Sequence, residues 1–113
     1  MRNNAQIMPL LTTDKQEIIT LINLKVSLKR VLGDFENKMQ EEDERYDVYF
    51  DLQENLGEGF AEPTVRKWLN THNNEYPPLT RLVTLCRQIG ASKPLRVAAN
   101  YLIMVADAID KVK

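Results

Sequence analysis

The chain has 113 residues, of which 43% are hydrophobic and 27% charged, and its formal net charge is −1. These values predict one globular domain that is long enough to bury a sizeable core. The single cysteine, Cys86, excludes an intrachain disulfide, and with the single histidine, His72, it excludes a Cys/His zinc cluster built from one chain.

The amino-terminal residues 1–12 are polar, contain Pro9 and show no hydrophobic period. We expect them to form a flexible arm ahead of a single all-α domain over residues 13–113. They lack the apolar stretch of a secretory signal, and no run elsewhere approaches the roughly 20 apolar residues of a membrane span. A cytoplasmic protein without a membrane partner is therefore expected.

A long amphipathic helix is predicted next, because apolar residues recur at steps of three and four from Ile18 to Met39. Gly33 stands inside this stripe and either ends the helix or is tolerated at a cost of about 1 kcal/mol relative to alanine. A helix over residues 14–44 would be on the order of 45 Å long, so part of it would project from a small domain or reach a partner. Residues 40–45 have no apolar position and are either exposed helix or a linker.

Two short helices are predicted on either side of a glycine-containing turn. The first covers residues 46–56, and Gly57-Glu58-Gly59 ends it with the strongest break in the chain. The second covers residues 62–71, with Pro63 in its first turn, where the missing N–H costs nothing.

The second short helix has one apolar face, formed by Val65, Trp68 and Leu69 at helical spacing. We expect that face to point inward and Trp68 to be a core residue. A polar loop over residues 72–78 follows.

The last two helices are predicted over residues 79–89 and 94–112. The first of them has the cleanest apolar stripe, which includes Cys86 as a buried small hydrophobe, and Gly90 follows as its cap. The second has the alternating three-and-four step of a coiled-coil seam. Its seam residues are Leu95, Ala98, Leu102, Val105, Ile109 and Val112. We find no alternating strand pattern, so the fold expected is all-α with about five helices.

Charge is unevenly distributed along the chain. Residues 34–60 carry ten acidic side chains against two basic ones, a net charge of −8, whereas residues 1–33 carry +3 and residues 61–100 carry +4. The sequence pI of 5.8 is far below that of a strongly basic nucleic-acid-binding domain. A local basic face is nevertheless sufficient for phosphate contacts.

Residues 46–90 resemble the DNA-binding helix-turn-helix of lambda-repressor/Cro-like regulators. The resemblance rests on Leu52-Gln-Glu-Asn-Leu56-Gly57-Glu-Gly59-Phe60-Ala-Glu-Pro-Thr-Val65-Arg-Lys-Trp68-Leu69-Asn70, followed by a helix that ends at Gly90. The run Thr-Val-Arg-Lys-Trp-Leu-Asn also looks like phage CII-type regulators and some antitoxins. If the family's spacing is anchored on Val65 and Trp68, Glu54 and Glu58 stand at positions that are normally apolar. If it is anchored on Leu52 and Leu56, the turn is longer than the family's and Gln53 stands where a small residue is usual. Either the turn is enlarged or the first helix is not 46–56.

The resemblance implies a lambda-repressor-like core flanked by an N-terminal and a C-terminal helix, and a recognition helix over residues 62–71 that enters the major groove. Arg and Asn side chains can read guanine and adenine edges there, and loop residues can hold phosphates. The candidate DNA-binding residues are Glu62, Thr64, Arg66, Lys67, Asn70, Thr71, His72, Asn73 and Arg81.

Enzyme activity is not expected. One histidine and one cysteine leave few candidates for a nucleophile and base, and no phosphate-binding glycine motif is present. No catalytic residue, metal ligand or cofactor is assigned.

The function expected is therefore that of a sequence-specific transcriptional regulator, such as a phage repressor, which binds duplex DNA as a homodimer. The helix over residues 94–112 has the better dimer seam and the helix over residues 14–39 is the runner-up, although both can instead pack on the core. The alternative is a protein-binding module, of the anti-repressor or antitoxin kind, that presents the acidic surface of residues 34–60 to a basic partner. The two hypotheses differ in whether the acidic run 41–44 lies beside Arg66 and Lys67.

Overall fold

The computed structural model describes residues 15–112, and the arm expected over residues 1–12 lies outside this range. The described chain forms five α-helices and one short 3-10 helix and contains no strand, which confirms the all-α prediction. No described helix is long and apolar enough to cross a membrane. The elements are α2 (Lys15–Gln40), α3 (Val48–Leu56), η1 (Glu58–Phe60), α4 (Glu62–Leu69), α5 (Leu79–Ile89) and α6 (Lys93–Val112).

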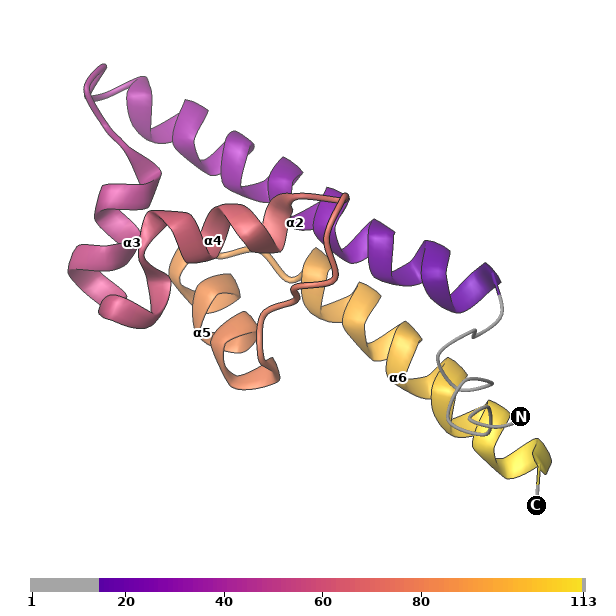
Figure 1. Cartoon of the computed structure of the whole chain (residues 1–113). Helices are drawn as coiled ribbons and strands as arrows, with labels where there is room; N and C mark the ends of the chain where they lie inside the picture. Colours follow the sequence, from indigo (N-terminus) through magenta and orange to yellow (C-terminus); the bar gives the residue numbers. More distant parts are fainter. Residues whose placement is uncertain (1–14, 113) are drawn as a thin grey trace.

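The molecule is elongated, with principal extents of 56 × 22 × 21 Å. Helices α2 and α6 lie side by side and run in opposite directions, while α3, α4 and α5 gather around one end of this pair (Figure 1). We call the three short helices, with η1 and the connecting loops, the head. The part of the pair beyond them, residues 15–23 and 102–112, is called the stalk.

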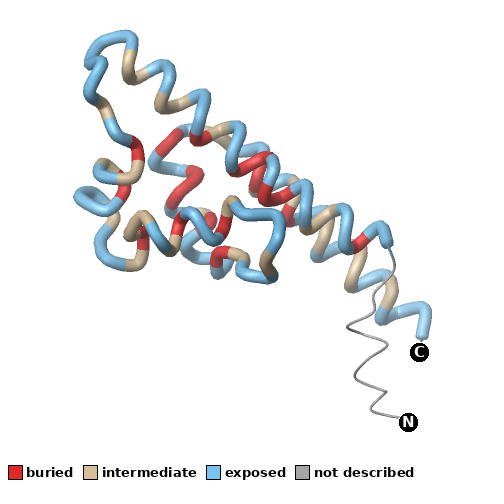
Figure 2. The backbone as a smooth tube through the Cα atoms, turned by 45° about the horizontal axis from the view of Figure 1, so that its top comes forward, coloured by how far each residue is buried: buried red, intermediate tan, exposed pale blue. Residues whose placement is uncertain are grey.

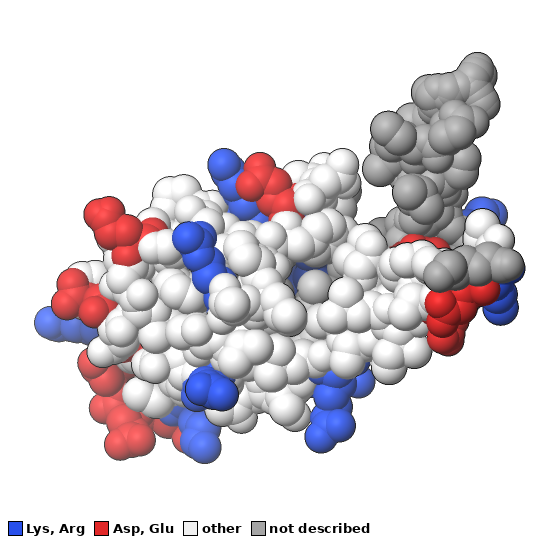
Figure 3. Space-filling model, turned by 90° about the horizontal axis from the view of Figure 1, so that it is seen from below, with Lys and Arg blue, Asp and Glu red and all other residues white. Residues whose placement is uncertain are grey.

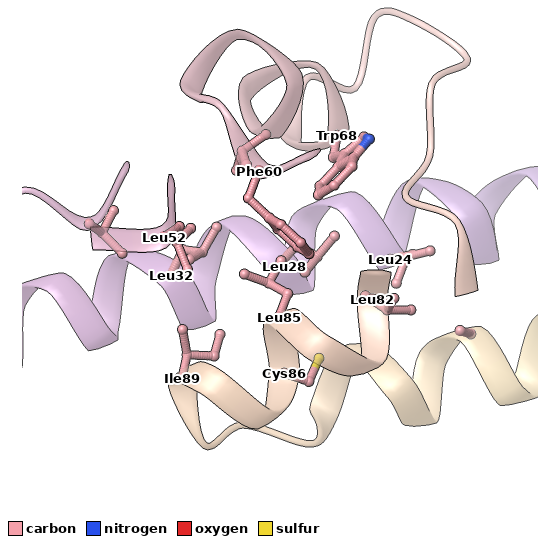
Figure 4. Close-up of a cluster of buried hydrophobic side chains, with 13 residues drawn as sticks. Leu24, Leu28, Leu32, Leu52, Phe60, Trp68, Leu82, Leu85, Cys86 and Ile89 are labelled. Atoms are coloured by element: carbon pink, nitrogen blue, oxygen red, sulfur yellow. The ribbon is translucent and has the colours of Figure 1, made fainter. Parts of the chain in front are cut away.

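One apolar cluster joins the head to the two long helices. In Figure 4, α2 contributes Leu24, Leu28 and Leu32, and side chains from α3, η1, α4 and α5 point toward them. Trp68 is 3% exposed and meets the ring of Phe60 edge-on, with the ring centroids 5.9 Å apart. Trp68 and Cys86 are therefore core residues, as the apolar stripes predicted.

Helix α2 continues through Gly33 and ends at Gln40. A Cβ at Gly33 would meet nothing within 4 Å, so this glycine contributes no close packing. The acidic residues 41–44 form turns rather than helix, and the chain then reverses into α3. The Phe35 and Tyr46 rings pack edge-on at 6.1 Å across this reversal.

Two carboxylates fix the start of α3. Asp47 caps the helix by accepting the backbone N–H of Tyr49 at 2.9 Å and that of Phe50 at 3.4 Å. Glu36 of α2 accepts the N–H of Val48 at 3.0 Å. Because the free N–H groups of a helix start favour negative charge, these two acidic residues anchor α3 to α2.

The turn between α3 and α4 is filled by η1. Gly57 ends α3 at φ 97°, a left-handed conformation that glycine adopts without a Cβ penalty, and its N–H donates to the Gln53 carbonyl. Phe60 then places its side chain in the core. The residues of this turn thus form a 3-10 turn that buries Phe60, rather than an open loop.

Trp68→Ala is expected to lower the free energy of unfolding by about 3–5 kcal/mol, because it leaves a cavity among buried leucines. Phe50→Ala is the matched control, since Phe50 is 66% exposed and should change stability by less than about 0.5 kcal/mol. Urea denaturation followed by circular dichroism measures both variants. Equal effects would contradict this description of the core.

Candidate nucleic-acid interface

Helix α4 has one face in the core and the other in solvent. Val65 and Trp68 are buried, whereas Arg66 and Lys67 are exposed. The division of buried and exposed residues on this helix is the one that its apolar spacing predicted. The helix ends at Leu69, so Asn70 and the residues after it belong to the loop rather than to the predicted helix over residues 62–71.

Arg66 is held in a defined position at the surface. Its Nε donates to Glu62 Oε2 at 2.6 Å, and its guanidinium carbon lies 4.4 Å from the centroid of the Tyr49 ring. The hydrogen bond that Arg66 donates to Glu62, together with the nearby Tyr49, raises the pKa of Arg66. Glu62 therefore orients Arg66, while Tyr49 of α3 provides a flat surface beneath it.

Lys67 lies on the other side of the exposed face. Its Nζ is 4.0 Å from Glu75 Oε2, and both side chains are more than half exposed. Exposed ion pairs contribute only about 0 to 1 kcal/mol to the free energy of unfolding. Both Arg66 and Lys67 can therefore exchange their acidic partners for another anion at low cost.

A buried lysine of α2 caps the C-terminal end of α4. Lys25 is 1% exposed, and its ammonium group donates to the carbonyl oxygens of Lys67 at 3.0 Å and Trp68 at 3.3 Å. The last carbonyls of a helix have no partner within the helix and carry partial negative charge, so a cation there is favourable. Burial lowers the pKa of Lys25, while the charge of Glu75 opposes this shift.

The same ammonium group organises the loop after α4. It donates to Asn73 Oδ1 at 3.1 Å and to the Glu75 carbonyl, and it lies 4.5 Å from the centroid of the Tyr76 ring. Asn73 Oδ1 also accepts the N–H of Glu75 at 2.8 Å. Asn73, which the sequence suggested as a phosphate contact, thus has its side-chain oxygen occupied within the protein and retains only its amide nitrogen as a donor.

Asn70, Thr71 and His72 are exposed together at the start of this loop. Asn70 Oδ1 accepts the N–H of His72 at 2.8 Å, which closes a local turn. Their free donors lie directly beyond the exposed face of α4.

Arg81 belongs to another part of the head. It lies on α5, where Nη1 is 3.4 Å from the Gly59 carbonyl, and a Cβ at Gly59 would come within 3.0 Å of its guanidinium carbon. Arg81 is therefore packed beside η1. Thr64 is half-buried on α4, and Glu62 is occupied by Arg66.

A groove of about 830 Å³ separates the C-terminal half of α4 from α2. Arg66 and the exposed loop residues form one wall, and Lys29 of α2 stands on the other. Sequence spacing could not find Lys29, because it is an ordinary exposed lysine until the fold brings it beside α4. The groove is lined by Val26, Lys29, Leu32, Gly33, Glu36, Val48, Tyr49, Arg66, Leu69, Asn70, Thr71 and His72.

The acidic run 41–44 lies at the end of α2, beyond α3 and away from the loop that follows α4 (Figure 1). The acidic side chains whose charge raises the pKa of Arg66 are Glu62 and Asp47 instead. In the view of Figure 3, acidic side chains gather mainly toward the two ends of the long axis. Residues 41–44 therefore do not cover the exposed face of α4.

No group of three or more His, Cys, Asp or Glu side chains within residues 15–112 is arranged to hold a metal ion. Comparisons with protein-family models, with curated proteins and with solved structures found no match to this chain.

Lys25→Met should lower the free energy of unfolding by about 3 kcal/mol or more, because each buried acceptor left without a donor costs about 1–3 kcal/mol. Lys29→Met, an exposed position on the same helix, is the control and should cost less than about 0.5 kcal/mol. Chemical denaturation measures both values. A loss of stability no larger at Lys25 than at Lys29 would exclude this role for the buried ammonium.

Proposed function

We propose that this chain is a transcriptional regulator that binds duplex DNA in a sequence-specific way, with α4 entering the major groove. The observation that carries the proposal is the division of α4 into a buried face and an exposed face with Arg66 and Lys67 at its centre. A recognition helix needs both faces, since one holds it on its own domain and the other meets the bases.

The exposed groups have the chemistry of base and phosphate recognition. Arg66 can donate two parallel hydrogen bonds to guanine. Asn70 can donate to a base edge through its amide nitrogen, since its Oδ1 already accepts the N–H of His72. Lys67, Thr71 and His72 can donate to phosphates, which position the protein without reading sequence. Lys25 supports this role indirectly, because it orders the loop from which Asn70 and Thr71 project.

Binding as a homodimer follows from the small size of the recognition helix. Helix α4 has eight residues, Glu62–Leu69, so one copy reaches only a few base pairs. Two copies on related half-sites combine their contacts and give a useful specificity.

The first test is selection of bound fragments from random duplex DNA, followed by fluorescence anisotropy titrations of the selected site at several salt concentrations. We expect a palindromic site and an affinity that falls steeply with salt, with a slope of about −0.9 per neutralised phosphate. No enrichment, with affinity no tighter than about 10⁻⁴–10⁻⁶ M at physiological salt, would refute sequence-specific binding. The acidic surface of residues 34–60 would then be the candidate binding surface for a basic protein.

Arg66→Ala combined with Lys67→Ala should weaken binding of the selected site by roughly 100-fold and reduce the salt slope, without unfolding the domain. Arg87→Ala combined with Arg96→Ala makes the same change in net charge on exposed residues of α5 and α6. This control should bind nearly as tightly as the parent protein. If both double variants lose affinity equally, only overall charge matters and α4 is not the recognition helix.

A further inference from the structure

An apolar seam of α6 begins in the head and continues into the stalk. Leu95 and Ala98 pack against the core. Leu102 and Val105 follow at a spacing of seven residues, so they lie on nearly the same side of the helix. Ile109 and Val112 repeat the spacing once more, beyond the reach of the head.

Helix α2 has the corresponding seam at its other end. Lys25 and Leu28 are buried beneath the head. Ile18 and Leu21 precede them by seven residues each and therefore extend the same side of α2 into the stalk.

The two seams face the same side of the helix pair, because the loop after α4 contacts both helices at the point where the head ends. Tyr76 in this loop lies over Lys25 of α2. Tyr76 also packs against the buried cluster that includes Ala98 of α6, and the nearby Tyr101 adds to the rise in the pKa of Tyr76 that burial causes. The head therefore covers the common side of α2 and α6 up to this point.

Beyond Tyr76 no other element of residues 15–112 covers the seams. Ile18 is 45% exposed, and Leu102 and Ile109 are each 52% exposed. Figure 2 shows that buried residues concentrate around the head, whereas the far end of the helix pair is mostly exposed or intermediate. Eight of the ten large exposed hydrophobic residues in the described chain lie on these two helices, and four of the eight belong to the seams: Ile18, Leu102, Ile109 and Val112.

The other flank of the pair has a mixed chemistry. There the groove between α2 and α6 has apolar lining from Val26, Val97 and Ile103, but it also includes Thr20 and Asn23. Charged residues line that groove as well: Arg30, Asp34, Lys93 and Asp107. On the flank that continues the buried side of the head, both helices of the stalk instead present apolar residues at seven-residue spacing.

We propose that this apolar flank is the surface on which a second copy of the chain docks, so that the two stalks form a four-helix bundle. We call it the stalk seam: Ile18, Leu21, Leu102, Val105, Ile109 and Val112.

A second copy fits the stalk seam for two reasons. Seven-residue spacing is the pattern by which helices pack against helices, and the same patch on two copies is complementary to itself about a two-fold axis. The second reason rests on the proposed function, which needs two copies on paired half-sites. Two helices, each about 10 Å wide and exposed over about 17 Å, give roughly 340 Å² per copy, less than half of the roughly 800 Å² per partner of a standard interface.

The interface is small, so the free protein should exchange between monomer and dimer, and DNA with two half-sites should favour the dimer. Binding of the second copy on one DNA molecule is then effectively intramolecular, and it gains from the high local concentration.

Sedimentation equilibrium of the full chain over a wide concentration range tests the stalk seam. Leu102→Lys places a charge in the seam of each copy and should raise the dimer dissociation constant by roughly 100-fold, because each dimer loses two buried leucines. Leu79→Lys is the matched control, since Leu79 is 57% exposed on α5 and should leave dimerisation unchanged. Circular dichroism verifies that both variants fold.

Different results would overturn the stalk seam and the proposed function. A parent protein that is monomeric at every concentration, with and without DNA, or equal effects of the two lysine variants, would overturn the stalk seam while leaving DNA binding by α4 intact. A parent protein that dimerises through Leu102 but selects no DNA site would support the stalk seam and refute the proposed function. DNA binding by monomeric Leu102→Lys to a single half-site, weaker than the parent on the full site, is the result expected if both hold.

Discussion

The arrangement of the head depends on one buried cation. Lys25 projects from the middle of α2 into the space where α4 ends, and it is the only lysine or arginine among the described residues that is fully enclosed. Removing an ammonium group from water is unfavourable by several kcal/mol unless hydrogen bonds replace the lost hydration. Three backbone carbonyls and one side-chain amide provide those bonds, so the end of α4 and the following loop are held in one geometry.

This constraint explains how a short helix can present a stable surface. A helix of eight residues is only marginally stable by itself, and most of its stability comes from packing. Val65 and Trp68 hold its buried face, and Lys25 satisfies its last carbonyls from below. The groups on its other face therefore project from a rigid support, which lowers the entropy cost of binding a partner.

Helix α2 connects the regions of the molecule. Its C-terminal half is packed under the head, Lys25 and Lys29 at its centre stand beside α4, and its N-terminal half forms the stalk with α6. In a dimer joined through the stalk seam, any change in the packing of the stalks would be transmitted along this one helix to the groove beside α4. The distance between the two copies of α4 would thus be set by the same element that orders each of them.

The sequence by itself determined the local features of the fold. The three-and-four spacing of apolar residues predicted all five helices, Gly57 and Gly90 marked two of their ends, and the buried face of α4 followed from Val65 and Trp68. Such features depend on residues within a few positions of one another, so they can be read from the chain. The helix predicted at about residues 62–71 ends at Leu69, because Asn70 is extended and Lys25, distant in sequence, caps the last carbonyls.

Only the tertiary structure decided which of these local features meet. A lysine inside the apolar stripe of α2 was the one sign in the sequence that Lys25 has a structural role. Its hydrogen-bond partners could not be predicted, because they lie more than forty residues away in the chain. Three other features were also decided by the packing of segments distant in sequence. Lys29 lines the groove beside α4, Arg81 donates to the Gly59 carbonyl, and the acidic run 41–44 lies away from α4. Contacts of this range depend on how whole helices pack, and helix packing is set by the shapes of complete faces rather than by the spacing of residues along one of them.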